Sequence, residues 1–192
     1  MLDRKEQSRQ RIIDSAGCHL KESGIAGTSV AGVMDGAGMT VGGFYAHFPS
    51  KQALVVEALT SSFRKARDVL HAGLEGKSGS EWVSAVARRY LSRSHRDAPA
   101  HGCPLPATAG ELARADQSVR NALAGELGSS VSELEQKLLE AGVDSPRGEA
   151  LAALSLMVGG MTLARALKGT PLSDEVLIAC REHVARRAGA SP

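Results

Sequence analysis

Aromatic residues are scarce in this sequence: they make up 3% of 192 residues, with one tryptophan, two tyrosines and three phenylalanines. Aromatic and β-branched side chains fit a pleated sheet best, so their scarcity argues against a β-rich fold. Alanine, leucine, glutamate and arginine, which favour helices, are abundant instead. We therefore predict an all-α protein of about nine helices from this balance and from the apolar spacing.

Cysteine and long apolar runs are also few. Three cysteines without a CxxC pair predict no disulfide framework, and the charged first dozen residues, MLDRKEQSRQRI, do not resemble a signal peptide. The longest nearly apolar run, residues 150–164, is shorter than the roughly 20 residues that cross a bilayer. We expect a cytoplasmic protein with reduced thiols and no membrane partner. The net charge of +2 does not by itself indicate a nucleic-acid partner.

Helical spacing of apolar residues recurs along the whole chain. A first helix is predicted to end at Gly24, a second to begin with Thr28 as N-cap and to break at Gly38, and a third, short one to begin with Thr40 as N-cap and to close at Pro49. Longer helices are predicted after Ser50, from about residue 80, and over 105–115, 119–141, 149–167 and 173–188, with 95–106 as an irregular connection.

The short third helix has an unusual composition. Gly42 and Gly43 lie side by side, and each costs a helix roughly 1 kcal/mol relative to alanine. Directly behind them come Phe44, Tyr45 and Phe48, half of the aromatic residues in the chain. Either the glycines relieve crowding between helices, or they let the backbone approach a partner closely.

The run GTSVAGVMDGAGMTVGGFYAHFPSKQAL, residues 27–54, resembles the DNA-binding signature of the TetR family of bacterial transcriptional regulators. The resemblance implies a helix-turn-helix DNA-binding domain over residues 1–50 and a helical ligand-binding and dimerisation domain over 51–192. It also implies a homodimer, most often a repressor, that binds a pseudo-palindromic operator in double-stranded DNA and is released by a small molecule. No enzyme activity, cofactor or metal is expected from it.

The same resemblance implies DNA contacts for particular residues. Phosphate contacts fall on Thr28, Tyr45, His47 and Lys51, whereas Thr40, Val41, Gly42 and Gly43 face bases or backbone. Each has a plainer alternative: the threonines as helix caps, Tyr45 as core, His47 and Lys51 as solvated surface residues. Val41 departs from the polar residue often found there, and it offers only apolar contact, for example with a thymine methyl group. Arg4, Lys5, Arg9 and Arg11 are further phosphate-contact candidates or simply solvated charges.

Family similarity in the second half is weaker, and its residues are interpreted mainly by themselves. The run LAALSLMVGGMTLARAL is apolar nearly all round, which predicts a helix buried on several sides. We predict a dimer interface there through Leu156, Gly159, Gly160 and Leu163, with a core helix of a monomer as the alternative.

Cys103 is the sensor candidate. It precedes Pro104, and a thiol at a helix start near His95, Arg96 and His101 would have thiolate character. GCPL there also resembles the start of the sixth helix in TetR-like proteins that respond to electrophiles. The alternative is a small packed residue. Phe63, Trp82 and Tyr90 are candidates for lining a pocket for an apolar or electrophilic ligand, or are ordinary core residues.

Two other function classes remain open. One is a helical thiol-dependent enzyme or peroxidase with Cys103 as nucleophile and His101 as base; the other is a helical carrier or scaffold that binds no DNA. The spacing of His95, His101 and Cys103 matches no zinc pattern, so no metal site is predicted.

Overall fold

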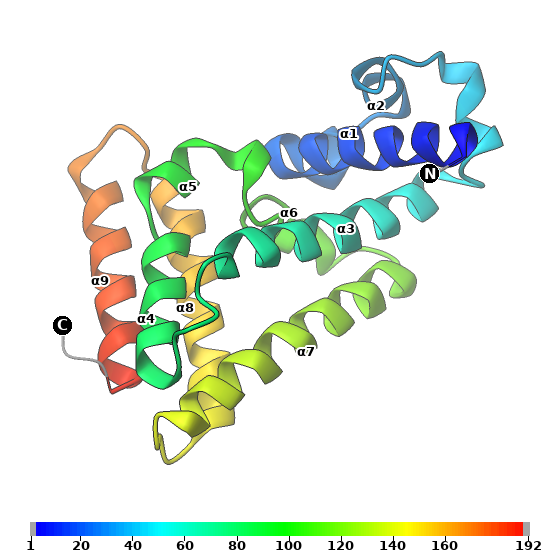
Figure 1. Cartoon of the computed structure of the whole chain (residues 1–192). Coiled ribbons are helices and arrows are strands. Elements are labelled where there is room, and N and C mark those ends of the chain that lie inside the picture. The colour runs from blue at the N-terminus through cyan, green and yellow to red at the C-terminus, as the bar shows by residue number, and fades with distance from the viewer. Residues whose placement is uncertain (1–2, 190–192) are drawn as a thin grey trace. The chain divides into compact units, whose positions relative to one another are not determined.

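Helices make up nearly all of the chain (Figure 1). The computed structural model describes residues 3–189, and over this range it contains nine α-helices, two 3₁₀ helices and no strand, which confirms the all-α prediction. The elements are α1 (Arg4–Gly27), α2 (Val30–Gly36), η1 (Val41–Ala46), α3 (Lys51–His71), α4 (Gly79–Tyr90), α5 (Arg93–Asp97), η2 (Pro99–His101), α6 (Leu105–Leu112), α7 (Gln117–Glu140), α8 (Pro146–Ala166) and α9 (Pro171–Arg187).

The helices gather into two compact units. The first holds the described residues up to Ala66 together with Pro99–Glu126, and the second holds Arg67–Ala98 together with the described residues from Leu127 onward. Packing therefore divides the chain differently from the functional boundary that the sequence predicts after residue 50. That functional boundary stays a prediction.

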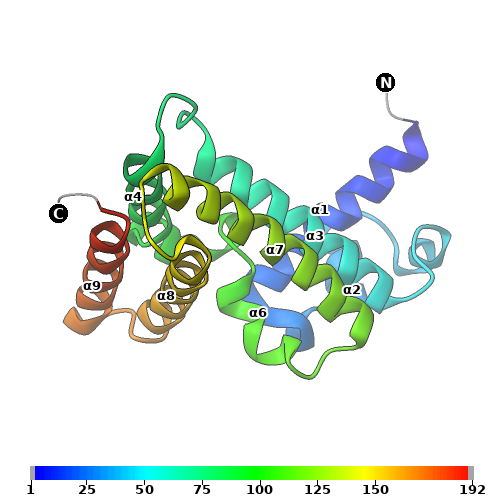
Figure 2. The ribbon, with the colours of Figure 1, turned by 90° about the horizontal axis from the view of Figure 1, so that it is seen from below.

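In the first unit, α1 packs against α2 and α6 (Figure 2). Ile12 and Leu20 of α1 are fully buried, as are Met34 of α2 and Leu54 of α3. Gly24 interrupts the helical geometry of α1 with φ 70 and ψ −172, in the region that glycine adopts most readily. The predicted helix end at Gly24 is thus a kink, after which one more turn reaches Gly27.

The short third helix predicted from the sequence is a 3₁₀ helix, η1 (Val41–Ala46), and is called the recognition segment below. Two consecutive glycines lower the α-helical propensity of this six-residue segment, and Pro49 follows closely. Short 3₁₀ turns are common where an α-helix cannot propagate. The described residues nevertheless form nine α-helices, because the unpredicted helix α5 (Arg93–Asp97) overlaps the start of the stretch predicted to be irregular, with Ser92 Oγ accepting from His95 N at 3.2 Å.

In the second unit, α8 and α9 lie side by side, and α4 packs on α9 (Figures 1 and 2). Val83, Leu91, Leu138 and Met161 are its largest fully buried side chains. A Cβ on Gly160 would lie 2.8 Å from Cys180 Sγ and 3.1 Å from Leu91 Cδ2. The close packing of α8 on α9 therefore depends on the missing side chain at this position.

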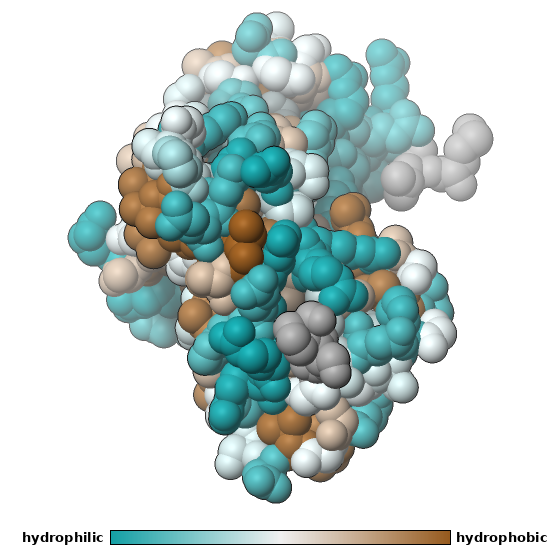
Figure 3. All heavy atoms as spheres, turned by 90° about the vertical axis from the view of Figure 1, so that its left-hand side faces the viewer, coloured by the Kyte–Doolittle hydropathy of each residue, from teal (hydrophilic) through white to brown (hydrophobic). Residues whose placement is uncertain are grey.

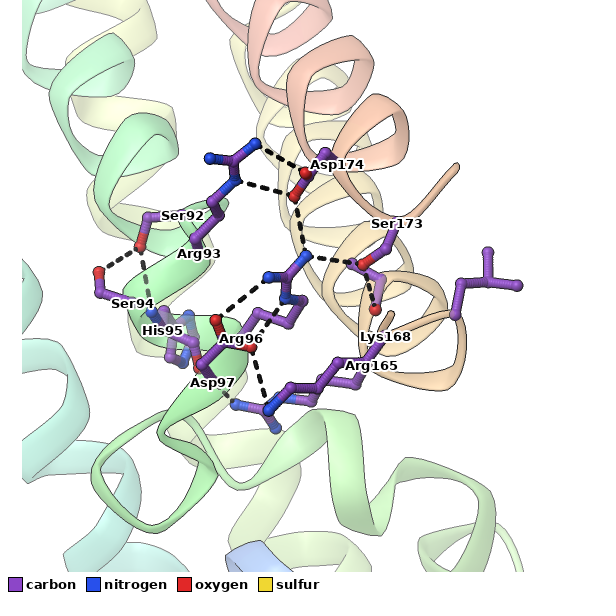
Figure 4. A network of polar contacts seen from close by, with 12 residues as sticks. Ser92, Arg93, Ser94, His95, Arg96, Asp97, Arg165, Lys168, Ser173 and Asp174 are labelled. Carbon is purple, nitrogen blue, oxygen red and sulfur yellow. Dashed lines mark hydrogen bonds and ion pairs between the residues drawn. The ribbon is translucent and has the colours of Figure 1, made fainter. Parts of the chain in front are cut away.

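The short helix α5 is tied to the start of α9 by two arginines (Figure 4). Arg93 Nη2 donates to Asp174 Oδ2 at 2.7 Å, and Arg96 Nη1 donates to Asp174 Oδ1 at 2.9 Å and to Ser173 Oγ at 2.8 Å. The Ser173 hydroxyl in turn donates to Ala164 O of α8 at 2.6 Å. One cluster thus connects three helices of this unit.

Asp97 completes the cluster on its other side. Arg96 Nε donates to Asp97 Oδ1 at 2.9 Å, and Lys168 Nζ lies 3.2 Å from the same oxygen. The Arg96 guanidinium, with Lys168, lowers the pKa of Asp97 from 3.8 to about 2. Hydrogen bonds from Arg93 and then Arg96 likewise lower the pKa of Asp174.

One helix in the described range, α8, is long and apolar enough to cross a membrane by length and composition alone. The apolar run 150–164 is shorter than a bilayer span, but the helix that contains it is longer, because Pro146–Glu149 form a polar first turn. Six of its residues, from Ala150 to Ala164, are buried within the second unit.

Candidate nucleic-acid interface

The turn between α2 and η1 is fixed by backbone-directed contacts. Ser29 Oγ accepts from Gly32 N at 3.0 Å and caps α2, while Gly38 adopts φ 65 at the other end. The Arg11 side chain donates to the carbonyl of Ala37 at the same end. Together these contacts fix where η1 begins after the helix-turn-helix turn.

Two buried aromatic side chains anchor η1 to the core. Phe44 and Phe48 are each 1% exposed, and their ring centroids lie 5.9 Å apart in a stacked arrangement. The Arg9 guanidinium lies 4.8 Å from the centre of the Phe48 ring. A short segment with little helical propensity is thus anchored by two of its own aromatic side chains.

The outer side of η1 is exposed and includes apolar surface. Tyr45 is 77% exposed and Val41 is 52% exposed, although the Phe44 ring packs edge-on against Tyr45 with centroids 5.2 Å apart. The alternative of Tyr45 as a core residue is therefore wrong. A phenol held outward on an anchored turn is suited to donate a hydrogen bond to a phosphate.

The two glycines differ in their surroundings: Gly42 is exposed and faces open space, whereas Gly43 is half-buried. Within the described chain nothing lies within 4 Å of a Cβ built on Gly42, and one on Gly43 would meet only Met34 Cε and Thr40 Oγ1 at 3.9 Å. Neither glycine has a positive φ. Crowding between helices therefore does not explain them, and the backbone is left bare toward the outside at Gly42.

His47 and Lys51 border this surface. Lys51 Nζ donates to Ile25 O at 3.2 Å, at the carboxyl end of α1. The Nδ1 atom of half-buried His47 is enclosed and has no hydrogen-bond partner among residues 3–189. Their predicted phosphate contacts are not tested by these positions and remain predictions.

The predicted N-cap position is wrong for Thr28 and right for Thr40. Thr28 is 2% exposed, and its hydroxyl donates to Gly24 O at 2.7 Å, so Ser29 and not Thr28 is the N-cap of α2. Thr40 occupies the N-cap position of η1, but its exposed side chain makes no capping bond within the described residues. Local hydrogen bonds of neighbouring hydroxyl residues are hard to rank from sequence, which is why the cap is misplaced by one residue. Contacts of both threonines with DNA stay predictions.

The sensor candidates are divided between the two units. Cys103, 7% exposed, and Phe63, 7% exposed, belong to the first unit, whereas Trp82 and Tyr90 are buried in the second. The His71 ring contacts Trp82 edge-on at 4.8 Å, and the His95 ring contacts Tyr90 at 4.6 Å. Burial is established for all four, but a common pocket remains a prediction.

The charged neighbour of Cys103 is one that the sequence did not suggest. His95 and Arg96 belong to the other unit, where His95 Nδ1 lies 2.6 Å from Tyr90 O and Arg96 joins the α5 cluster. Half-buried Lys21 of α1, whose pKa is lowered mainly by burial, interacts electrostatically with both Cys18 and Cys103. The sequence did not predict the pair Lys21 and Cys103, because the two residues are far apart along the chain and come together only when α6 packs on α1.

The four predicted interface residues of α8 differ in how exposed they are. Gly160 is buried against α9 and Leu91 of its own chain, whereas a Cβ on Gly159 would meet nothing within 4 Å and Leu163 is 55% exposed. Leu156 is half-buried. Other exposed apolar residues of α8 and α9 are Leu151, Leu172 and Ile178. Figure 3 shows apolar side chains among polar ones on the face that carries α9.

The fold and this surface define a helix-turn-helix protein with a helical second unit. Residues 12–58 match the pattern of bacterial regulatory proteins of the tetR family, and residues 79–176 match the C-terminal domain of LmrA/YxaF-like transcriptional regulators. The chain belongs to the TetR family and is a transcriptional regulator.

Individual relatives agree with this assignment. The chain is 30% identical over 95 residues to the HTH-type transcriptional repressor KstR2 of Rhodococcus jostii (strain RHA1); the match covers 47% of this chain and only about half, 47%, of that repressor. A TetR regulator from Chloroflexus aurantiacus J-10-FL shares 25% identity and a TM-score of 0.82, with 96% of both chains covered. A TetR-family regulator from Cytophaga hutchinsonii shares the fold, with a TM-score of 0.79 at 23% identity and 97% coverage of both chains.

Proposed function

We propose that this regulator is a cytoplasmic, homodimeric repressor that binds a pseudo-palindromic operator through the outer side of η1. The observation that carries the proposal is the aromatic-anchored segment Val41–Ala46, whose exposed side presents bare backbone at Gly42 between the exposed side chains of Val41 and Tyr45. Backbone amides without neighbouring side chains can approach a phosphate or the floor of a groove closely. The family membership agrees with DNA as the partner.

The DNA contacts follow from these positions. Tyr45 donates its hydroxyl to a phosphate, the Gly42 and Gly43 backbone approaches the DNA, and Val41 contacts an apolar base edge such as a thymine methyl group. Thr40 and His47, which flank η1 in the sequence, and Lys51 at the start of α3 are proposed to add polar contacts. We assign Thr28 only a backbone contact, because its hydroxyl is engaged by Gly24 O.

Dimerisation is proposed through α8 and α9. Leu163, Leu151 and Leu172 are each about half exposed, and Gly159 presents open space beside them. Covering such apolar stripes is what a self-complementary two-fold interface achieves. We exclude Gly160 from the interface, since it is filled by contacts within its own chain.

Release from DNA is proposed to follow binding of a small apolar or thiol-reactive ligand. Cys103 is the candidate for the thiol-reactive signal because it directly precedes Pro104 and α6, and Lys21 of α1 interacts with it electrostatically. Burial of Cys103 to 7% exposure limits the access of any reagent to the thiol, so it weighs against a thiol-dependent enzyme and against a thiol-reactive inducer alike. Turnover of a peroxide or a quinone by the purified protein would establish the enzyme instead.

The test is selection of fragmented genomic DNA with purified protein at defined salt. We expect recovery of a symmetric duplex with half-sites about one helical turn apart, or a multiple of it. Enrichment no greater than that of a random duplex would refute the function. Adding a quinone to the recovered complex, with Cys103→Ser as the control, then tests the thiol-reactive signal: release of the wild type alone supports it.

A further inference from the structure

A single carboxylate fastens the last turn of α1, after the kink at Gly24, to α6. The backbone N–H of Ala26 donates to Glu111 Oε2 at 2.6 Å. The kink at Gly24 interrupts the regular hydrogen bonding of α1 just before this amide, so its partner comes from another helix. Hydrogen bonds to a charged acceptor are stronger than neutral ones.

The second oxygen of the same carboxylate lies against Gly24. A Cβ built there would be 2.1 Å from Glu111 Oε1 and 3.2 Å from Ala107 O. One face of α6, from Ala107 to Glu111, thus rests directly on the bare Cα of Gly24. Both the positive φ and this contact require glycine at position 24.

The turn that Glu111 holds is also connected to the DNA-binding helices. The Thr28 hydroxyl donates to Gly24 O at 2.7 Å, and Lys51 Nζ, at the start of α3, donates to Ile25 O at 3.2 Å. Ser29, which caps α2, follows immediately. A displacement of this turn therefore displaces the beginning of α2 and, through α2, the segment η1.

We propose that Glu111 is a positioning residue, through which α6 sets the placement of the α2–η1 surface. The inference rests on the proposed DNA-binding function, and it assigns the regulation of DNA binding to the hydrogen bond between Glu111 and Ala26. α6 begins two residues after Cys103, so a change at that thiol or in a nearby ligand reaches the turn through the Glu111–Ala26 hydrogen bond. Losing the contact uncouples α6 from the DNA-binding surface.

Hydrogen–deuterium exchange on the full chain tests the contact without any DNA. Glu111→Ala is expected to raise exchange roughly three- to ten-fold in peptides covering residues 24–36, while exchange in α8 and α9 is unchanged. Glu111→Gln keeps an oxygen acceptor and is expected to restore part of the protection. Glu22→Ala, which removes an exposed carboxylate of α1, is the matched control and is expected to change nothing. Equal exchange in wild type and Glu111→Ala would overturn the proposal.

Affinity for the duplex recovered by selection tests the consequence. Glu111→Ala is expected to weaken binding roughly three- to ten-fold, Glu111→Gln less, and Glu22→Ala not at all. Faster exchange with unchanged affinity would overturn the positioning role. If the wild type itself binds no duplex, the proposed function fails, and the exchange measurement still decides separately whether the Glu111 contact holds the turn.

Discussion

At the scale of single residues, a substitution at Gly42 is expected to affect folding stability and DNA binding in opposite ways. Gly42→Ala adds a methyl group in open space at a φ that alanine adopts, so the free energy of unfolding is expected to stay equal or to rise by about 0.4–1 kcal/mol. Operator affinity is expected to fall at least ten-fold, because the methyl group keeps the backbone from the DNA.

The control for this variant is Gly128→Ala, at an open position of α7. It is expected to gain similar stability without any loss of affinity. Urea unfolding and fluorescence anisotropy with the recovered duplex measure the two quantities. Wild-type affinity in Gly42→Ala would show that the bare backbone is not part of the interface.

At the scale of elements, the packing of α8 on α9 depends on Gly160. Gly160→Ala would place a methyl group 2.8 Å from Cys180 Sγ, and overpacking of this kind typically costs about 1–3 kcal/mol of unfolding free energy. Gly160→Ala combined with Cys180→Ala is expected to recover part of this loss, because the clashing sulfur is removed. Gly159→Ala, one residue away in open space, is expected to leave the monomer fold as stable as before. Thermal unfolding of the wild type, of Cys180→Ala and of these three variants checks the cycle.

The ion pair between Arg96 and Asp97 of α5 contributes to the free energy of unfolding in a pH-dependent way. Because Arg96 lowers the pKa of Asp97 from 3.8 to about 2, the ionised carboxylate favours the folded state above pH 3.8, and this contribution is lost as the pH falls toward 2. Asp97→Asn is therefore expected to be less stable than wild type at neutral pH, with the difference shrinking between about pH 4 and 2. Asp144→Asn, at an exposed position after α7, is the control. A difference independent of pH would contradict the assigned ion pair.

The sequence predicted elements better than it predicted their contacts. Helical spacing located eight of the α-helices, and the glycine–aromatic pattern located the recognition segment, because both depend on neighbours along the chain. The 3₁₀ geometry of Val41–Ala46, the cap at Ser29 and the helix α5 were missed, since small local energies decide each of them. Lys21 beside Cys103 and Glu111 on the turn were missed for another reason: both pairs form only when α6 packs on α1.

At the scale of the whole molecule, binding to a two-fold symmetric operator requires a dimer. Leu163→Glu places a charge on the proposed two-fold interface and is expected to shift the sedimentation coefficient from dimer to monomer. Leu139→Glu, at a similarly exposed leucine of α7, is the matched control and is expected to remain dimeric. A dimeric Leu163→Glu variant would move the interface away from this part of α8.

The most direct test of the central claim is the affinity of Tyr45→Phe for the recovered duplex over a range of salt concentrations. Tyr45 is 77% exposed, so removing its hydroxyl is expected to leave unfolding unchanged. The account predicts affinity about ten-fold weaker than wild type, as for loss of one phosphate hydrogen bond per half-site. Equal affinity of the two proteins at every salt concentration would contradict the proposal that this side of η1 contacts the operator.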